Sequence, residues 1–335
     1  LPLLSVSGVQ ENAAVTYYYT PHESIAGYSE YESSGDIPAI DENTAINSLD
    51  EEGNNTYYVY AKTAATTNYT AGMSNIVELT VTEPVAASVI KADGADRGTY
   101  NSLPVALNAA QDGDTIKLLA DLTAGGLIIT KSVTLDLNGH AIAYIEVGLT
   151  DEDTGDVLTG NLTVADTSAE KNGKVTSKIE LVVGNLTING GTIGGTGRDD
   201  GITIKSGTLT VNGGTIASLY GEEGNNDTVT ITGGAVQRAQ LGPDFKITVN
   251  GGSGHSGLWD VSEGTWNIWG GEFEGVTFLT ESPAENLHIT GGTFGKITRQ
   301  ILKIGGNGEE ELAPISGLLA DGYAFYQKTD SEEYD

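Results

Sequence analysis

The sequence predicts an all-β protein whose larger part is a parallel β-helix, and three observations carry that prediction. A phrase centred on Gly-Gly recurs six times between residues 186 and 294. Its copies read LTINGGTI, LTVNGGTI, VTITGGAV, ITVNGGSG, WNIWGGEF and LHITGGTF. Their first glycines stand at 190, 213, 233, 251, 270 and 291, and a period of about 20 residues is typical of a solenoid. No segment of helical periodicity separates the copies, which argues against leucine-rich and helical repeats.

Each copy of the phrase predicts a strand followed by a bend. Apolar, polar, apolar is the period of a strand. The Gly pair allows a backbone bend that a Cβ would obstruct, and the apolar residue after it, such as Ile193 or Phe294, points inward again. Three short strands and three turns need about 20 residues. Coils of that length, stacked about 4.8 Å apart, form a parallel β-helix. Degenerate copies are expected at 133–142 and 161–166.

Composition restricts the partners and the compartment. The formal net charge is −30, from 16 basic and 46 acidic residues, so we expect neither nucleic acid nor an anionic membrane as a partner. The sequence holds no cysteine, and no run of about 18 apolar residues predicts a membrane span. The chain begins at Leu1 without methionine or a visible signal peptide, and we expect a mature fragment. Architecture and acidity together predict an extracellular location, at the cell surface or secreted.

Residues 1–83 differ from the repeats and predict a small β-sandwich. They hold nine of the 15 tyrosines, 12 acidic residues and one basic residue, Lys62. Strands are expected at 13–20, 56–64 and 75–82, with the tyrosines packing across strands and a sugar-binding face as the alternative. The runs TYYVYAKTA at 56–64 and SNIVELTV at 74–81 resemble the late strands of immunoglobulin-like modules in bacterial surface proteins. Residues 84–97 are expected to form a linker.

A helix that caps the β-helix is predicted over residues 102–111. Its apolar side chains recur at helical spacing and belong to Leu103, Ala106, Leu107 and Ala110. Ser102 is placed to cap the start, and Gly113 to end the helix. An open end of a β-helix exposes core and unpaired strand edges, so a helix with a narrow apolar stripe suits it as a lid. The apolar run at 315–326, within residues 301–335, is expected to cap the other end.

The start of the repeat region resembles a known superfamily. ALNAAQDGDTIKLL at 106–119 and SVTLDLNGHAI at 132–142 resemble the N-terminal cap and first coils of β-helices of the pectate-lyase-like superfamily. The resemblance implies a right-handed parallel β-helix of about 8–10 coils over residues 98–335. It does not choose an activity, because that superfamily includes lyases, hydrolases, phage tailspikes and surface adhesins.

Two fragments resemble the active site of polygalacturonases, which are similar in fold. RDDG at 198–201 and GHSG at 254–257 make Asp199, Asp200 and His255 the candidate catalytic residues. Asp200 and His255 are 55 residues apart, or roughly 10–14 Å along the axis, because two to three coils separate them. No third acidic partner is placed to complete the pair of carboxylates that inverting hydrolysis needs, and the Arg-x-Lys element of that family is absent. We therefore expect no catalysis, with solvated turns at these fragments.

Metal binding is expected to be weak or absent. The run DEDTGD at 151–156 offers Asp151, Asp153 and Asp156 as candidate Ca²⁺ ligands, without the spacing of an EF-hand and without an arginine in register to serve as a lyase base. A solvated loop is the alternative. The four histidines show no metal-ligand spacing, so no cofactor other than Ca²⁺ is considered.

The tryptophans supply the candidate ligand site. Trp266 occupies the inward position of the phrase, Trp269 occupies the bend position and should be exposed, and Trp259 lies in the preceding turn region. An exposed ring beside acidic acceptors suits a sugar, because the ring stacks on C–H groups while carboxylates accept its hydroxyls. The predicted ligand-binding residues are Trp259, Trp269, Glu272 and Glu274, with packing as the alternative. At the bend position of other copies, Asn189, Asn212 and Asn250 are expected to form a side-chain ladder.

The sequence thus predicts a non-enzymatic extracellular bacterial surface protein, an adhesin or stalk segment that binds glycans or a host or cell-surface protein. The alternative is a polysaccharide lyase or glycoside hydrolase acting on an acidic polysaccharide. Three or more charged side chains converging in a cleft on neighbouring coils would favour the enzyme.

Overall fold

The computed structural model divides the chain into two units, Leu1–Pro84 and Val85–Asp335. The residues that it describes are 14–20, 39–40, 56–67, 70–74, 77–80, 85–151, 153–197, 200–221, 227–280, 285–302, 310–312, 314–319, 322 and 324. None of the helices in this part of the chain has the length and apolar character that a membrane span requires.

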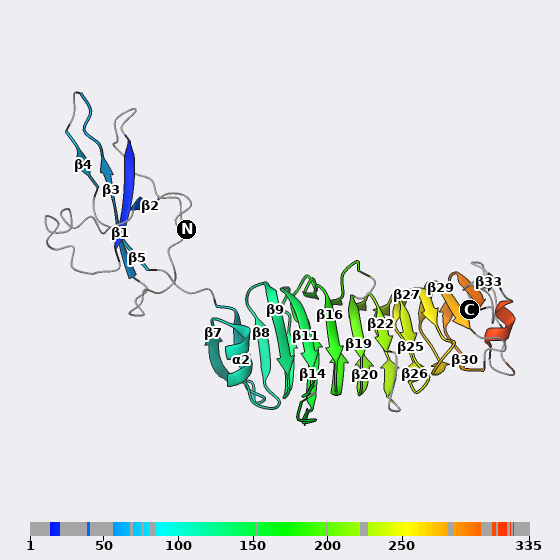
Figure 1. The fold of residues 1–335 in the computed structure, drawn as a ribbon. Helices are drawn as coiled ribbons and strands as arrows, with labels where there is room; N and C mark the ends of the chain where they lie inside the picture. Colours follow the sequence, from blue (N-terminus) through cyan, green and yellow to red (C-terminus); the bar gives the residue numbers. More distant parts are fainter. Residues whose placement is uncertain are drawn as a thin grey trace, which may run out of the picture. The chain divides into compact units, whose positions relative to one another are not determined.

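The described part of the first unit is an antiparallel sheet (Figure 1). Its strands are β1 (Val15–Thr20), β2 (Ala39–Ile40), β3 (Thr56–Thr63), β4 (Gly72–Met73) and β5 (Val77–Thr80). The long strand β3 lies between β1 and β5, and Tyr18 is the register partner of Tyr60. The three strands expected from the sequence are confirmed, whereas the immunoglobulin-like assignment stays a prediction.

The second unit is a parallel β-solenoid of the right-handed type with about nine turns, as the repeat predicts (Figure 1). Its first sheet holds one strand from each turn: β8 (Thr115–Leu118), β10 (Ser132–Asp136), β14 (Gly160–Ala165), β17 (Gly184–Ile188), β20 (Thr208–Val211), β23 (Thr228–Ile231), β26 (Lys246–Val249), β28 (Thr265–Ile268) and β30 (Leu287–Ile289).

The second sheet of the solenoid takes up the rest of each turn. Its strands are β9 (Leu122–Ile129), β11 (Ala141–Val147), β15 (Lys174–Val175), β16 (Lys178–Leu181), β18 (Thr192–Ile193), β19 (Gly201–Ile204), β21 (Thr215–Ile216), β22 (Leu219–Gly221), β24 (Ala235–Val236), β25 (Ala239–Leu241), β27 (Ser253–Asp260), β29 (Glu272–Thr280), β31 (Thr293–Phe294), β32 (Ile297–Leu302) and β33 (Glu310–Leu312). Middle turns use two short strands here, as a coil of three strands requires. In other turns, one long strand, β11, β27 or β29, takes the place of the two short ones.

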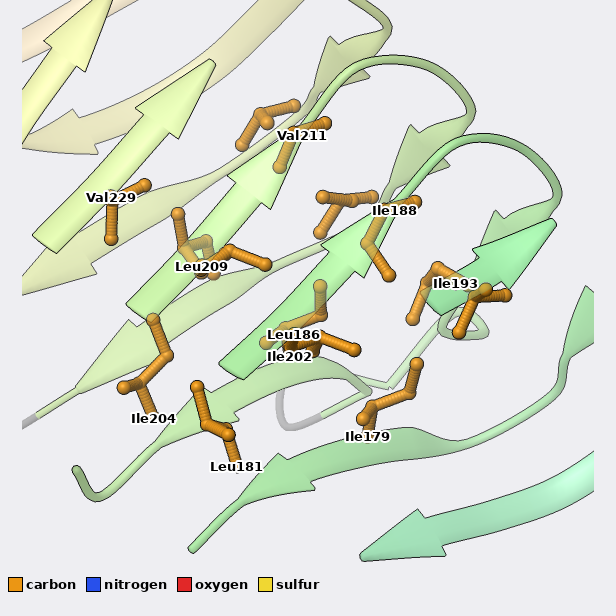
Figure 2. Packing of buried hydrophobic residues seen from close by; sticks show 14 of the residues in the cluster. Ile179, Leu181, Leu186, Ile188, Ile193, Ile202, Ile204, Leu209, Val211 and Val229 are labelled. Carbon is orange, nitrogen blue, oxygen red and sulfur yellow. The ribbon is translucent and has the colours of Figure 1, made fainter. Parts of the chain in front are cut away.

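Because successive turns pair in strict register, equivalent apolar side chains stack on one another and form the core. Leu186, Leu209 and Val229 are direct neighbours on β17, β20 and β23, and all are buried. Figure 2 shows these inward rows facing Ile202 and Ile204 of the second sheet. Each turn thus stacks its apolar side chains on those of the next, which is how a solenoid gains a continuous core from short strands.

Polar ladders run beside the core. The amide of Asn212 donates to Oδ1 of Asn189 over 2.9 Å, and the hydroxyl of Thr232 donates to Oδ1 of Asn212 over 2.7 Å. The predicted ladder at the bend is therefore confirmed for Asn189 and Asn212. A further amide pair, Asn185 and Asn161, joins an earlier pair of turns over 2.6 Å.

The N-terminal end of the solenoid is closed by a hairpin and a helix. Residues 87–97, expected as part of a linker, instead belong to the solenoid unit, and most of them lie in β6 (Ala87–Ile90) and β7 (Asp96–Tyr100). Strand β6 pairs antiparallel with β8, so the hairpin covers the edge of the first sheet. The linker prediction failed because Ala87 and Val89, which are fully buried, were too few to stand out as a strand pattern.

Helix α2 (Leu103–Ala109) lies over the same end of the core, as predicted. Its buried face comprises Leu103 and Ala106, and Leu107 is only partly buried. The expected cap is wrong in its chemistry, since the Ser102 side chain makes no capping hydrogen bond. Instead, the ammonium of Lys131 donates to the carbonyl oxygens of Leu107, Asn108 and Ala110, over 2.9, 3.1 and 2.9 Å. A cation from the next turn thus satisfies the helix C-terminus.

The C-terminal end is closed by the 3₁₀ helix η2 (Ile315–Leu318) and β33. Leu318 is fully buried in the core, and Leu319 bridges to Ile289 of the last turn. Buried Arg299 donates from Nε to the hydroxyl of Thr280 over 3.0 Å and from Nη1 to the carbonyl of Pro314 over 3.3 Å. Tyr323, Phe325 and Tyr326 of the predicted cap lie outside the described residues.

One hairpin leaves the solenoid between β11 and β14. It consists of β12 (Leu149–Thr150) and β13 (Val157–Leu158), paired antiparallel. Val157 and Leu158 are exposed. The hairpin leaves the stacking of the turns in register, because β10 of one turn pairs with β14 of the next without a bulge.

Candidate functional site

The Gly-Gly bend between the two sheets brings successive turns close together. The second glycine of each pair has φ between 72° and 108°. The first glycine packs on the turn before it: a Cβ on Gly270 would lie 2.5 Å from the carbonyl oxygen of Asn250, and one on Gly291 would lie 2.3 Å from that of Trp269. Both positions therefore exclude a side chain, as the sequence predicts.

Because these bends carry no side chains, they form an open hollow that we call the glycine trough. It has a volume of about 650 Å³ and is lined by glycines of four consecutive turns, from Gly233 to Gly292, together with Ser253, Glu272 and Thr293. The three polar residues are direct register neighbours and form one edge. Four turns at strand spacing make the trough roughly 15 Å long, enough for a short oligosaccharide.

Trp269 immediately precedes the Gly270–Gly271 bend, whose second glycine lines the glycine trough. It follows β28, is 59% exposed, and is separated from Glu272 by the Gly270–Gly271 pair alone. Glu272 and Glu274 begin β29 and are both exposed. The predicted exposure of Trp269 is confirmed. The indole supplies a flat apolar face, and the carboxylate at the trough edge supplies hydrogen-bond acceptors.

The other two tryptophans belong to the core. Trp266 is fully buried between Ile247 and Leu287 in register, as expected from its position in the phrase. Trp259 is also fully buried, and it lies in strand β27, not in a turn. The prediction that Trp259 contributes to a ligand surface is therefore wrong, because its indole contacts other core rings and has no exposed area.

The two described candidate catalytic residues, Asp200 and His255, each have partners of their own. His255 is fully buried, with its ring 4.9 Å from that of Phe273 and 5.5 Å from that of Trp259. Asp200 binds its own loop, accepting from the backbone N–H of Gly197 over 2.9 Å and from the hydroxyl of Ser177 over 3.3 Å. Asp199 lies outside the described residues. A histidine enclosed by aromatic rings cannot reach a polysaccharide on the surface, so the resemblance to polygalacturonases fails at this residue.

The hydrogen bonds of His255 fix its neutral form. Its Nδ1 accepts from the backbone N–H of Val236 over 3.2 Å, so Nε2 carries the proton and donates to the carbonyl oxygen of Gly251 over 3.1 Å. Burial lowers the pKa of His255, and the bond to Gly251 opposes this only in part. The folded state thus resists protonation of this ring, whereas the unfolded chain accepts a proton near pH 6.5.

We expect this difference to make the solenoid sensitive to mild acid. Below about pH 6.5 the unfolded chain binds more protons than the folded one. The free energy of unfolding therefore decreases as the pH is lowered, by at most about 1.4 kcal/mol per pH unit for one proton. His255→Phe keeps an aromatic ring but cannot be protonated, so its stability should decline less between pH 7 and pH 5. Urea unfolding of both proteins checks this. Equal declines would show that His255 does not titrate on unfolding.

The candidate Ca²⁺ residues lie at the tip of the β12–β13 hairpin. Oδ1 of Asp151 accepts from the backbone N–H groups of Asp153 and Thr154, over 2.9 and 3.0 Å, and these bonds lower its pKa. Asp151, Asp153 and Asp156 are exposed. Among the described residues, no group of three or more His, Cys, Asp or Glu side chains is placed to hold a metal ion.

Sequence reasoning missed a charged cluster on the outer face of the second sheet, the Glu180 cluster. Oε1 of Glu180 lies 2.6 Å from Lys205 Nζ, and Oε2 lies 2.9 Å from Lys178 Nζ and 2.8 Å from the hydroxyl of Tyr144. Glu146, the register neighbour of Glu180, is 3.3 Å from the same hydroxyl. Alternating Lys and Glu in KIEL at 178–181 was the only sequence signal for it.

The Glu180 cluster brings together charges from three neighbouring turns, yet its groups satisfy one another. Burial raises the pKa of Glu180, but hydrogen bonds from Lys205, Lys178 and Tyr144 outweigh it and hold the pKa at about 2. Burial and the bond to Glu180 raise the pKa of Tyr144 above its ordinary value. Near neutral pH, Glu180 is therefore ionised and Tyr144 protonated, and neither is poised to exchange a proton with a substrate.

The fold and the site together define a capped parallel β-solenoid with an open polar trough over its glycine bends. No family model matches the chain, and no curated protein or solved structure does so either.

Proposed function

We propose that this chain is a non-enzymatic extracellular bacterial surface protein, an adhesin or stalk segment, whose solenoid binds a glycan along the glycine trough. The supporting observation is the exposed Trp269, which directly precedes one of the bends that form a hollow of bare backbone about four turns long. A saccharide chain laid there stacks one ring on the indole and turns hydroxyl groups to Ser253, Glu272 and Thr293. The pectate-lyase-like superfamily and the immunoglobulin-like module belong to the same proposal.

Chemistry and charge favour binding over turnover. In the described residues, every buried side-chain nitrogen or oxygen has a hydrogen-bond partner within the protein, so none of them needs a substrate to complete its hydrogen bonding. The net charge of −30 disfavours an anionic polysaccharide by repulsion. We therefore expect a neutral glycan as the ligand of the trough.

Trp269→Ala should weaken glycan binding without unfolding the protein. Loss of one stacked ring costs about 0.5–1.5 kcal/mol, or roughly a two- to twelvefold rise in Kd. Glycan-array screening of the intact chain, followed by titration of the best ligand, measures this. Trp269→Phe keeps a ring and should retain most of the affinity. His288→Ala, on the outer face of the first sheet, is the matched control and should bind normally.

Two outcomes contradict the proposal. The first is that no glycan binds the folded protein, or that Trp269→Ala binds as tightly as the parent. The second is a steady release of reducing ends or unsaturated uronides from an acidic polysaccharide. If Asp200→Asn or Glu180→Gln abolished that release, the lyase or hydrolase alternative would replace the proposal.

A further inference from the structure

A second hollow lies at the opposite end of the second-sheet strands, and we call it the Tyr220 cleft. It has a volume of about 220 Å³, and its polar lining consists of Tyr220, Gln240, Asp260, Ser262 and Glu263. Ser253 at one end of β27 lines the glycine trough, and Asp260 at the other end lines this cleft. The length of β27 separates the two hollows by roughly 20–25 Å, so they are independent sites.

Strand register aligns the three central side chains of the cleft. Tyr220, Gln240 and Asp260 are direct neighbours on β22, β25 and β27. The residues before them in each strand, Leu219, Ala239 and Trp259, are buried in the core. Alternation along a strand therefore turns Tyr220, Gln240 and Asp260 outward, in one row with steps of about 4.8 Å.

The carboxylate of Asp260 is held in place before any ligand arrives. Its Oδ1 accepts from the hydroxyl of Ser262 over 2.5 Å and from the backbone N–H of Ser262 over 3.2 Å. Trp266 fixes the chain beyond it, because its indole N–H donates to the carbonyl oxygen of Glu263 over 2.8 Å. A fixed acceptor loses little entropy when it binds, which is the advantage of a preorganised site.

The lining defines the ligand chemistry. It combines one phenol ring, one amide, one aliphatic hydroxyl and two carboxylates, and none of the described lining residues is basic. An aromatic ring with amide and carboxylate partners is suited to the C–H face and hydroxyls of a sugar. Two carboxylates disfavour a uronic acid by like-charge repulsion. The volume lies below the roughly 300–1,000 Å³ of sites for larger ligands, so it fits a single ring.

We propose that the Tyr220 cleft binds one neutral hexose unit, with the ring against Tyr220 and its hydroxyls on Gln240, Asp260 and Glu263. This site is separate from the glycine trough, so the intact chain carries two independent saccharide sites, one at each end of β27. A branched or folded glycan meets both, and a single short chain meets only one.

Saturation-transfer NMR on the intact protein tests the proposal with the methyl glycosides of glucose, galactose and mannose. The methyl glycoside of galacturonic acid, with its carboxylate free, is the anionic comparison. At least one neutral glycoside should receive saturation, and galacturonate should receive little. Gln240→Ala and Asp260→Asn should each raise the Kd about tenfold, the cost of one hydrogen bond to a charged or fixed partner. Gln240 is exposed, so its variant should fold normally. Trp269→Ala removes the contribution of the glycine trough, so the saturation that remains in this variant should still depend on Gln240 and Asp260.

Three results would overturn the inference. They are the absence of saturation for every neutral glycoside, equal affinities in the parent and both cleft variants, and a complete loss of signal in Trp269→Ala, which would assign all the binding to the glycine trough. Binding of Ca²⁺ that depends on Asp260, without binding of any glycoside, would identify the cleft as a cation site and also refute the hexose proposal.

Discussion

Replacing Trp259 with alanine will destabilise the solenoid by about 3–5 kcal/mol, because it removes a large side chain from the middle of the core. The indole of Trp259 lies 5.9 Å from that of Trp266, and 5.4 and 6.3 Å from the rings of Phe273 and Phe278. For a domain of this size, the loss lowers the melting temperature by about 10 °C. Thermal unfolding followed by circular dichroism measures the shift.

Trp269→Ala is the matched control for Trp259→Ala, because it removes the same side chain from the surface. Its stability should stay within about 0.5 kcal/mol of the parent. Together the two variants separate packing from binding, since one should unfold easily and the other should lose ligand. Equal melting temperatures for the parent and Trp259→Ala would show that the aromatic cluster does not stabilise this part of the solenoid.

Ala106→Asp will open the N-terminal end of the solenoid. Ala106 is fully buried on the inner face of α2, and its cluster includes Ile116 and Leu118 of the first strand of the first sheet. A carboxylate there loses its hydration without gaining a partner, at a cost of about 3 kcal/mol or more. We expect a lower melting temperature, and faster proteolysis that begins at residues 85–120 and not at the C-terminal turns.

Val105→Asp is the control for Ala106→Asp. Val105 is the preceding residue of α2 and is 50% exposed, so the same charge meets solvent there. Its stability should match the parent. If both variants were equally stable, α2 would not be a lid, and the closure of this end would depend on the hairpin of β6 and β7.

The repeat made most of the solenoid predictable, because register follows from pattern when identical phrases stack. The inward rows and the left-handed second glycine of each bend follow from the phrase alone. The helix lid was also predictable from its apolar stripe. The hydrogen bonds from Lys131 to the C-terminus of α2 were not predictable, because the lysine lies 21–24 residues away and no local pattern specifies the direction of its side chain.

The site was harder to predict, and β27 shows why. In the other phrases the position after the bend holds an inward apolar residue, such as Val236 or Phe273, whereas this phrase has Gly254 there. The strand bulges on both sides of His255, which becomes the register partner of Phe273 and fills the vacant core position. A histidine that resembled a catalytic residue is therefore a core residue. The glycine in an inward position was the signal that its neighbour must replace it.

The Tyr220 cleft escaped sequence reasoning for a different reason. Its residues are 20 positions apart, at Tyr220, Gln240 and Asp260, and no two of them form a motif. Only the register of β22, β25 and β27 brings them together. Sites that run along a solenoid axis have this character, because their residues come from separate turns and have no common local signature.

The β12–β13 hairpin has a consequence for how this protein tolerates change in length. It adds a loop to one turn while β10 and β14 stay paired residue for residue. Extra sequence at its tip, residues 153–155, therefore extends away from the rod and leaves the stacking of the turns intact. The hairpin marks a natural grafting point, where evolution or an experimenter can add an epitope, a protease site or a small module to a scaffold of fixed register.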